Sequence, residues 1–197
     1  MVVPGRKSAL LVVDVQNDFA DAQGSLYVRG GEAVVPVVNH EVARAQAEGR
    51  LVVYTQDWHP EHTPHFQLDG GVWPVHCVAG SWGAEFVRGL VIAGPVVRKG
   101  TGGEDGYSGF SVRDPKSGAS APTELEKLLR DAAVSELLVV GLATDYCVKE
   151  TALDAVRLGF ETSVLLAGTR AVDLHPGDGL RAVEAMATAG VALVGAG

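Results

Sequence analysis

The chain has 197 residues, of which 47% are hydrophobic and 20% are charged. This length and composition predict one folded domain over residues 1–197 with a substantial buried core, and they exclude a disordered protein. The formal net charge of −8 argues against nucleic acid and against an anionic membrane surface as partners. We therefore expect a small-molecule partner and no nucleic acid or membrane.

The cellular setting is predicted from the opening residues and the cysteines. Residues 1–7 are too short and too polar for a secretory signal, and no apolar stretch has the length of a membrane span. The chain has two cysteines, Cys77 and Cys147, and nothing that indicates export. We expect a cytoplasmic protein in which both thiols are free.

Apolar runs alternate with segments of helical spacing along the whole chain. This alternation predicts an α/β fold, a three-layer α/β/α arrangement around a six-stranded, mostly parallel sheet. A dinucleotide-binding Rossmann domain is disfavoured because no G-x-G-x-x-G follows the first strand. In chain order we predict strand 8–13, helix 32–48, strand 51–55, strand 96–99, helix 123–130, strand 137–140, helix 145–158, strand 162–166, helix 180–189 and strand 191–194.

Two long segments have no periodic pattern. Residues 57–83 are dense in Trp, His, Pro and Gly, which is typical of a functional loop, and residues 100–120 are polar and Gly-rich. Two helix starts carry capping signals. Thr123 and Glu126 match a capping box, and Thr144 or Asp145 is expected as the N-cap of helix 145–158.

Four chemically reactive side chains each lie just past the end of a short apolar run. They are Asp14, Asp57, Lys99 and Cys147. Parallel strands end at one edge of a sheet, and open α/β sheets bind their ligands there. A carboxylate, an ammonium and a thiol at one edge are the parts of an activated cysteine nucleophile.

Cys147 is the candidate nucleophile. In the first turn of a helix, backbone N–H groups are expected to lower the pKa of its thiol and to bind an oxyanion. Asp14 is the candidate general base, and Lys99 is expected to hold the thiolate and to orient the carboxylate by charge. We interpret Cys77, in the middle of the long loop, as a packing residue.

The long loop carries a candidate metal site. Asp57 and His59 point to one side of an extended segment, and His76 completes the set that we favour. His65 is expected as a fourth ligand, and His62 as an outer or solvent residue. Such ligands suit one divalent ion, zinc first, with iron or manganese as alternatives. His40 and His175 lie outside the cluster and receive no role.

Three aromatic residues, Phe19, Trp73 and Tyr107, follow strand ends rather than core positions. Together they could enclose a flat heteroaromatic ring, and taken singly each is about as well explained by a satellite packing cluster. Trp58 and Trp82 are expected to be packing residues.

Several of these segments together resemble the isochorismatase-like cysteine hydrolases, and within them the nicotinamidase/pyrazinamidase group. The matching segments, which occur in the family's order, are residues 13–19, 57–60, 73–78, 99–100, 107–110 and 141–148. The resemblance implies a triad of Asp14, Lys99 and Cys147 and a divalent metal on Asp57, His59 and His76, with His65 at a variable position.

The resemblance also implies finer features. It implies a cis peptide between Leu142 and Ala143, and an oxyanion hole formed by the N–H groups of Ala143 and Cys147. One difference is Arg98, which stands where an aromatic residue is common before the lysine. This difference puts the roof of the pocket, and hence its selectivity, in question.

The activity implied is hydrolysis of nicotinamide to nicotinate and ammonia through a thioester, with pyrazinamide as a further substrate. The pyridine ring would lie between Phe19 and Trp73, with Tyr107 nearby. The alternative is a cysteine amidase of the same fold that acts on a carbamoyl or ureido compound and does not need the histidines. A third hypothesis is a non-enzymatic protein that binds structural zinc. A homo-oligomer is compatible with the sequence.

Overall fold

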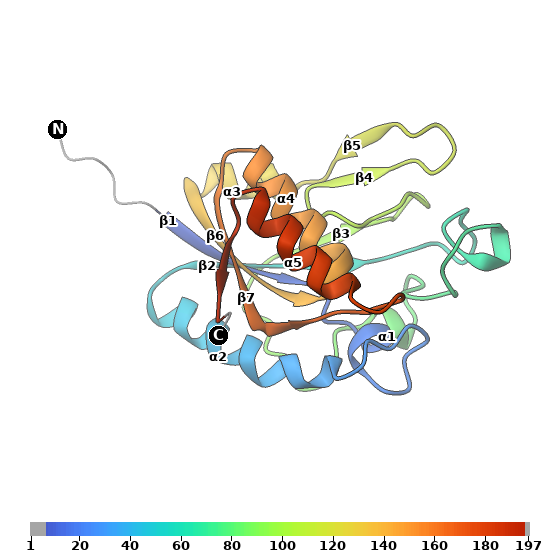
Figure 1. The fold of residues 1–197 in the computed structure, drawn as a ribbon, viewed down its shortest axis with the longest axis horizontal. Coiled ribbons are helices and arrows are strands. Elements are labelled where there is room, and N and C mark those ends of the chain that lie inside the picture. Colours follow the sequence, from blue (N-terminus) through green and yellow to red (C-terminus); the bar gives the residue numbers. More distant parts are fainter. Residues whose placement is uncertain (1–6, 196–197) are drawn as a thin grey trace.

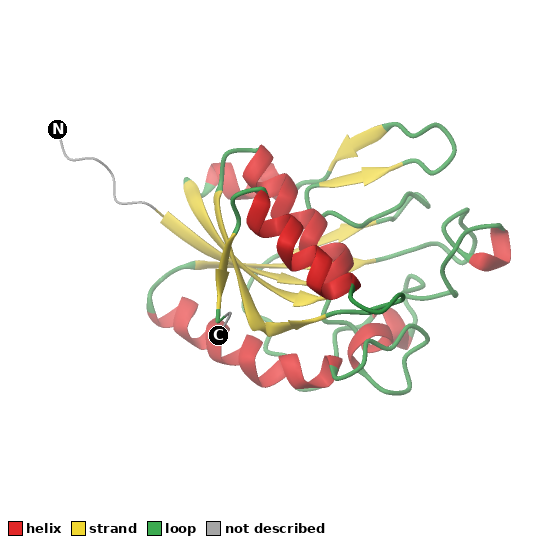
Figure 2. Ribbon diagram, viewed as in Figure 1, coloured by secondary structure: helices red, strands yellow, loops and turns green. Residues whose placement is uncertain are grey.

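An all-parallel six-stranded sheet forms the centre of the protein (Figure 1 and Figure 2). The computed structural model describes residues 7–195. The order of strands across the sheet is β3-β2-β1-β6-β7-β8, which confirms the predicted six-stranded parallel sheet. The strands are β1 (Lys7–Val13), β2 (Leu51–Asp57), β3 (Val96–Lys99), β6 (Val134–Leu142), β7 (Glu161–Arg170) and β8 (Ala192–Val194).

Helices cover both faces of this sheet, as predicted for three layers. Helix α2 (Val34–Ala47) covers one face, and α3 (Leu125–Asp131), α4 (Lys149–Arg157) and α5 (Asp178–Thr188) cover the other (Figure 1). Side chains alternate between the two faces along each strand, so β1 contributes to both hydrophobic cores. Leu10 packs in the core under α2, and Leu11 packs in the core under α4.

Some short elements have no counterpart in the predicted order. Helix α1 (Asn17–Ala20) follows β1, and a hairpin of β4 (Ser111–Arg113) and β5 (Ser120–Pro122) lies in the segment that we expected to be irregular. Elements of three or four residues contain too few side chains to show a period. Single 3₁₀ turns complete the order: η1 (Gly31–Ala33), η2 (Gln67–Asp69) and η3 (Trp82–Ala84).

Two predicted helix starts differ from the structure. The Thr123 hydroxyl accepts from the N–H of Leu125 at 3.2 Å, not from the N–H of Glu126 that a capping box requires, and Glu126 pairs with Arg130. The predicted capping box is therefore not formed. The helix predicted at 145–158 begins with a π-helical turn, η4 (Thr144–Val148), and continues as α4.

Neither Thr144 nor Asp145 caps this helix, so that prediction is wrong. Ala143 is the N-cap residue and has no capping side chain. The Asp145 carboxylate instead accepts from the N–H groups of Val172 and Asp173, both at 2.9 Å. It ties the start of η4 to the chain that follows β7.

The register of the strands aligns the candidate site residues. Val13 lies opposite Thr55 on one side and opposite Gly141 on the other, and Asp57 lies opposite Lys99. Since β3, β2, β1 and β6 are consecutive neighbours, the residues that end them meet at one edge. The long loops gather at this edge in Figure 1.

None of the helices within residues 7–195 combines the length and apolarity needed to cross a bilayer. The single domain predicted for residues 1–197 includes both chain ends, which lie outside the described residues. Most of the opening segment 1–7 also lies outside them. It stays a prediction.

The central strand gives a stability prediction. We expect Leu11→Ala, at a fully buried position, to lower the free energy of unfolding by about 2–5 kcal/mol, because the cavity adds to the lost burial. Leu174→Ala, at a position that is 61% exposed, should change it by less than about 0.5 kcal/mol. Urea denaturation measures both, and equal effects would contradict the assigned core.

Candidate active site

A buried ammonium group connects the four candidate residues at the edge of the sheet. The Nζ of Lys99 lies 2.7 Å from Oδ2 of Asp14, 2.5 Å from Oδ1 of Asp57 and 3.7 Å from the Sγ of Cys147. It also donates to the backbone carbonyl of Gly106. Oxygen or sulfur atoms of Asp14, Asp57 and Cys147 lie within 4.8 Å of one another. The structure therefore brings together the residues that the sequence placed at one edge.

Neighbouring side chains hold the carboxylate of Asp14 and the backbone of Asp57. The Thr55 hydroxyl donates to Oδ1 of Asp14 at 2.7 Å. The Gln16 amide donates to the Asp57 carbonyl and accepts from the Asp57 N–H, both at 2.8 Å. Thr55 and Gln16 were not singled out from the sequence, although Thr55 is opposite Val13 in the register.

Burial and charge set the protonation states of this cluster. Burial alone lowers the pKa of Lys99, but Asp14 and Asp57 outweigh it and hold that pKa well above its usual value. Burial raises the pKa of Asp14 more than Lys99 lowers it. For Asp57, burial is outweighed by Lys99 and the neighbouring histidines, which keep the pKa of that carboxyl below its usual value. Asp14 is thus the better proton acceptor of the two.

Burial raises the pKa of the Cys147 thiol well above its usual value, and the favourable charge of Lys99 does not compensate. The expectation that the helix start lowers this pKa is therefore wrong. Cys147 lies in the π-helical turn η4, a type of turn that is frequent at functional sites. A buried neutral thiol next to Asp14 needs that carboxylate to remove its proton.

Three histidines form a second cluster beside Asp57. Ring nitrogens of His59, His65 and His76 lie within 4.8 Å of one another, and all three residues are buried. Oδ2 of Asp57 lies 3.8 Å from Nε2 of His59. Asp57 therefore faces Lys99 with one oxygen and the histidines with the other. The predicted ligand set is brought together as a group.

The hydrogen bonds of these histidines suit a divalent cation. Among the described residues, neither buried ring nitrogen of His59 has a hydrogen-bond partner, which is costly unless something else binds them. Nδ1 of His65 pairs with Asp105 at 2.6 Å, and Nδ1 of His76 pairs with the Pro74 carbonyl at 2.7 Å. Outer partners of this kind are what metal-bound histidines have, so the residues present fit a metal ion.

Two of the three imidazoles, those of His65 and His76, are also in the form that binds metal. Burial lowers the pKa of His65, and it lowers the pKa of His76 to about 4. Both rings are therefore neutral at neutral pH, with a nitrogen lone pair available. Gly100 leaves room for the third ring, because a Cβ at this position would lie 2.5 Å from Cε1 of His59.

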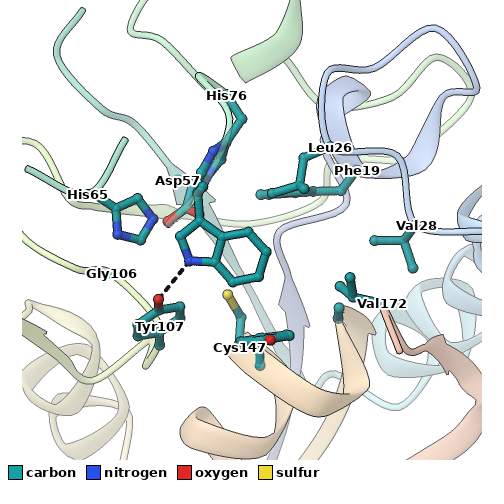
Figure 3. Close-up of a pocket in the computed structure, with 13 residues that line it drawn as sticks. Phe19, Leu26, Val28, Asp57, His65, His76, Gly106, Tyr107, Cys147 and Val172 are labelled. Atoms are coloured by element: carbon teal, nitrogen blue, oxygen red, sulfur yellow. Dashed lines mark hydrogen bonds between the residues drawn. The ribbon is translucent and has the colours of Figure 1, made fainter. Parts of the chain in front are cut away.

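A mostly apolar cavity, with about 430 Å³ of empty space that includes its open mouth, contacts both clusters. Figure 3 shows the Cys147 sulfur pointing into it, with His65, His76 and Asp57 on one side and Phe19, Leu26 and Val28 on the other. Nε1 of Trp73 donates to the Tyr107 hydroxyl at 2.7 Å, drawn as a dashed line (Figure 3). Phe19, Trp73 and Tyr107 thus line one pocket.

Other residues of the pocket were not found from the sequence. Leu26, Val28, Tyr146 and Val172 also line it. The Tyr146 ring packs edge-on against Trp73, with ring centres 4.9 Å apart. The position of Tyr146 next to Cys147 was the one sequence signal for its place in the pocket. Leu26 and Val28 lie in an irregular segment that shows no period.

Arg98 and the other two tryptophans lie away from this pocket. The Arg98 guanidinium stacks 3.8 Å from the centre of the Trp58 ring and donates to Gln56, so it does not form the roof of the cavity. Trp58 packs against the core, as expected. Trp82 does not, because it is 48% exposed.

The remaining histidines and cysteines agree with their predicted places. The side chain of His62 is 71% exposed and that of His175 is 79% exposed, and His40 is also exposed. Both cysteines are free thiols, and Cys77 is fully buried in the core. The predicted cis peptide between Leu142 and Ala143 is present.

The fold and this site define a hydrolase of the parallel α/β class with a cysteine in its catalytic cavity. The chain matches the model of the isochorismatase domain over residues 8–194, and the protein belongs to that family.

Relatives within the family carry more specific names. The nicotinamidase of Escherichia coli is 40% identical over 94% of this chain and 93% of its own. The zinc complex of the pyrazinamidase of Pyrococcus horikoshii superposes with a TM-score of 0.84 at 39% identity, over 95% of this chain and 98% of that chain. The PnC1 protein of L. infantum, in complex with nicotinate, has a TM-score of 0.86 at 35% identity, over 98% and 95% of the two chains.

The space around the His59 ring can be tested by comparing substitutions at two glycines. Gly100 and Gly89 both have left-handed backbones, with φ of 73° and 91°, but a Cβ at Gly89 would meet nothing within 4 Å. We expect Gly100→Ala to lower the free energy of unfolding by about 1–3 kcal/mol more than Gly89→Ala does, because only the former crowds a buried ring. Urea denaturation measures the difference. Equal losses would mean that the ring is not confined.

Proposed function

We propose that the protein is a nicotinamidase, a cysteine amidohydrolase that converts nicotinamide to nicotinate and ammonia. The observation that carries the proposal is one cavity lined by Cys147, whose sulfur lies next to the paired Lys99 and Asp14, and by His65 and His76 of the three-histidine cluster. The names of the relatives at 35–40% identity support the same activity. An amidase for carbamoyl or ureido compounds would not need the histidines, so it is less well supported.

The proposed roles follow from the protonation states. Asp14 takes the proton of Cys147, and the thiolate attacks the carboxamide carbon. Moving this proton to Asp14 leaves the charge of the buried cluster unchanged, whereas loss of the proton to water would add a negative charge in a low dielectric. Lys99, 3.7 Å from the sulfur, stabilises the thiolate.

The remaining steps use the same groups. The N–H groups of Ala143 and Cys147 bind the oxyanion of the tetrahedral intermediate. Asp14 then protonates the departing ammonia, and a thioester remains on Cys147. Asp14 next removes a proton from a water molecule, which attacks the thioester carbon. The C–S bond breaks, nicotinate is released, and Asp14 returns the proton to the sulfur of Cys147, which restores the thiol. Phe19, Trp73 and Tyr107 enclose the pyridine ring during these steps.

Asp57, His59, His65 and His76 would hold one divalent metal ion. When bound, this ion supplies a Lewis-acid site for the pyridine nitrogen of the substrate. Zinc is our preferred ion, in line with imidazole ligands and with the zinc bound by the Pyrococcus horikoshii pyrazinamidase. Pyrazinamide, which has the same carboxamide on a similar ring, is proposed as a second substrate. A cytoplasmic location and a homo-oligomer stay predictions of the sequence.

The nucleophile gives the direct test of the amidase. We expect Cys147→Ala to reduce ammonia release from nicotinamide by more than about 10⁴-fold, since Cys147 is the thiol that lines the cavity and would form the thioester. Cys77→Ala, which removes the other thiol, is the control and should retain turnover and thioester formation. Mass spectrometry of the acid-quenched enzyme should detect a nicotinoyl adduct on Cys147. Turnover by Cys147→Ala close to that of the unmodified enzyme would contradict the proposal.

The histidine cluster gives a separate test. We expect His59→Ala to lose bound metal and to raise KM for nicotinamide, because His59 has no other partner for its ring nitrogens. His62→Ala, in the same loop but exposed to solvent, should keep both at the level of the unmodified enzyme. Metal analysis and ammonia-release kinetics, before and after chelation, measure the effects. Equal metal content in the two variants would refute the site.

A further inference from the structure

We infer that Asp105 is a positioning residue for the metal site, which acts by holding the imidazole of His65 through its outer nitrogen. This inference rests on the proposed function, because it concerns the ion that the histidines are proposed to bind. Asp105 was not singled out from the sequence. It lies in the Gly-rich segment 100–120, forty residues after His65.

The contact between the two side chains is short and shielded. Oδ1 of Asp105 lies 2.6 Å from Nδ1 of His65. The side chains are only 22% and 5% exposed, respectively. With Nδ1 engaged, the other nitrogen of His65 is left to face His59 and His76, whose ring centres are 5.0 and 5.4 Å away. Asp105 thus selects the nitrogen and the ring orientation that the ion requires.

The backbone of Asp105 is fixed independently of this contact. Its N–H donates to the Arg113 carbonyl at 2.8 Å, and its carbonyl accepts from the Arg113 N–H at 2.9 Å. Arg113 ends β4, so the hairpin that the sequence did not predict sets the position of this carboxylate. The side chain of Asp105 can therefore be altered without removing the contacts that place the loop.

The two residues that follow Asp105 contact the other parts of the site. The Gly106 carbonyl accepts from Lys99, and the Tyr107 hydroxyl accepts from Trp73 (Figure 3). A Cβ on Gly106 would lie 3.1 Å from Oδ1 of Asp57, so only glycine lets the loop approach this closely without crowding. The tripeptide 105–107 therefore contacts the histidines, the lysine and the aromatic wall, the side of the pocket formed by Phe19, Trp73 and Tyr107.

A second His–Asp pair in the same region provides a built-in comparison. His62 and Asp69 lie 3.2 Å apart, but the side chain of His62 is 71% exposed and belongs to neither cluster. A surface pair of this kind contributes little to stability or to binding. Asp69→Asn is therefore the matched control for Asp105→Asn.

The test measures metal affinity on the full-length protein. Each variant is stripped of metal and titrated with Zn²⁺ in competition with a chromophoric chelator. We expect Asp105→Ala to weaken Zn²⁺ binding by about 10–100-fold, the range typical of outer-shell partners, and Asp105→Asn to weaken it less. Asp69→Asn should bind as the unmodified protein does. Activity of Asp105→Asn should return when Zn²⁺ is raised to saturation.

A double-mutant cycle shows whether Asp105 acts through His65. If it does, Asp105→Ala should have no further effect on Zn²⁺ affinity in a His65→Ala background. The alkylation rate of Cys147 in the metal-free protein should be the same with and without Asp105→Ala, because the loop backbone is held by Arg113. Additive losses in the cycle, or a changed alkylation rate, would overturn the inference and indicate a general effect on the loop.

The outcomes separate this inference from the proposed function. If the unmodified protein binds no stoichiometric Zn²⁺, the metal site itself fails, and the role of Asp105 fails with it. If the unmodified protein binds Zn²⁺ and Asp105→Ala binds it equally well, only the role of Asp105 is overturned.

Discussion

The site depends on one buried ammonium group, that of Lys99, held between two carboxylates. A lysine with no exposed side-chain surface stays charged only because Asp14 and Asp57 surround it. The same charge keeps Asp57 ionised towards the histidines and leaves Asp14, whose pKa is raised by burial, as the proton acceptor. Removing this charge would leave two buried carboxylates without compensation. The nucleophile side and the metal side of the cavity are thus coupled through a single cation.

The parallel sheet supplies the geometry that this coupling requires. Lys99 and Asp57 end β3 and β2, and Asp14 directly follows β1, so these three groups lie side by side at a spacing set by the ladder. Cys147 lies in the turn η4 that follows β6. Asp57 and Lys99 are direct partners in register. Rigid strand ends hold the charged groups, and loops supply the histidines and the aromatic wall, so the loops can differ among relatives while the central chemistry stays in place.

The part of the site carried by loops is less exposed to solvent than loops usually are. His59, His65 and His76 are buried, and each is confined by a different neighbour: the glycine turn at Gly100, the carboxylate of Asp105 and the Pro74 carbonyl. Burial lowers the pKa of His65 and His76 and so keeps these two rings neutral, and the confinement leaves ring nitrogens of all three free to face one another. This arrangement is the one that a pre-organised cation site needs, and surface histidines such as His62 lack it.

The parallel α/β fold could be predicted from the residues alone, because continuous apolar runs alternating with helical spacing permit few other arrangements. The same pattern placed Asp14, Asp57, Lys99 and Cys147 near strand ends and the histidines in one loop. Features that depend on contacts between distant residues could be learned only from the folded structure. Burial raised the pKa of Cys147 where the local helix start predicted the opposite. The pairing of His65 with Asp105, and of Thr55 with Asp14, joins residues some forty positions apart, and local patterns carry no information on such contacts.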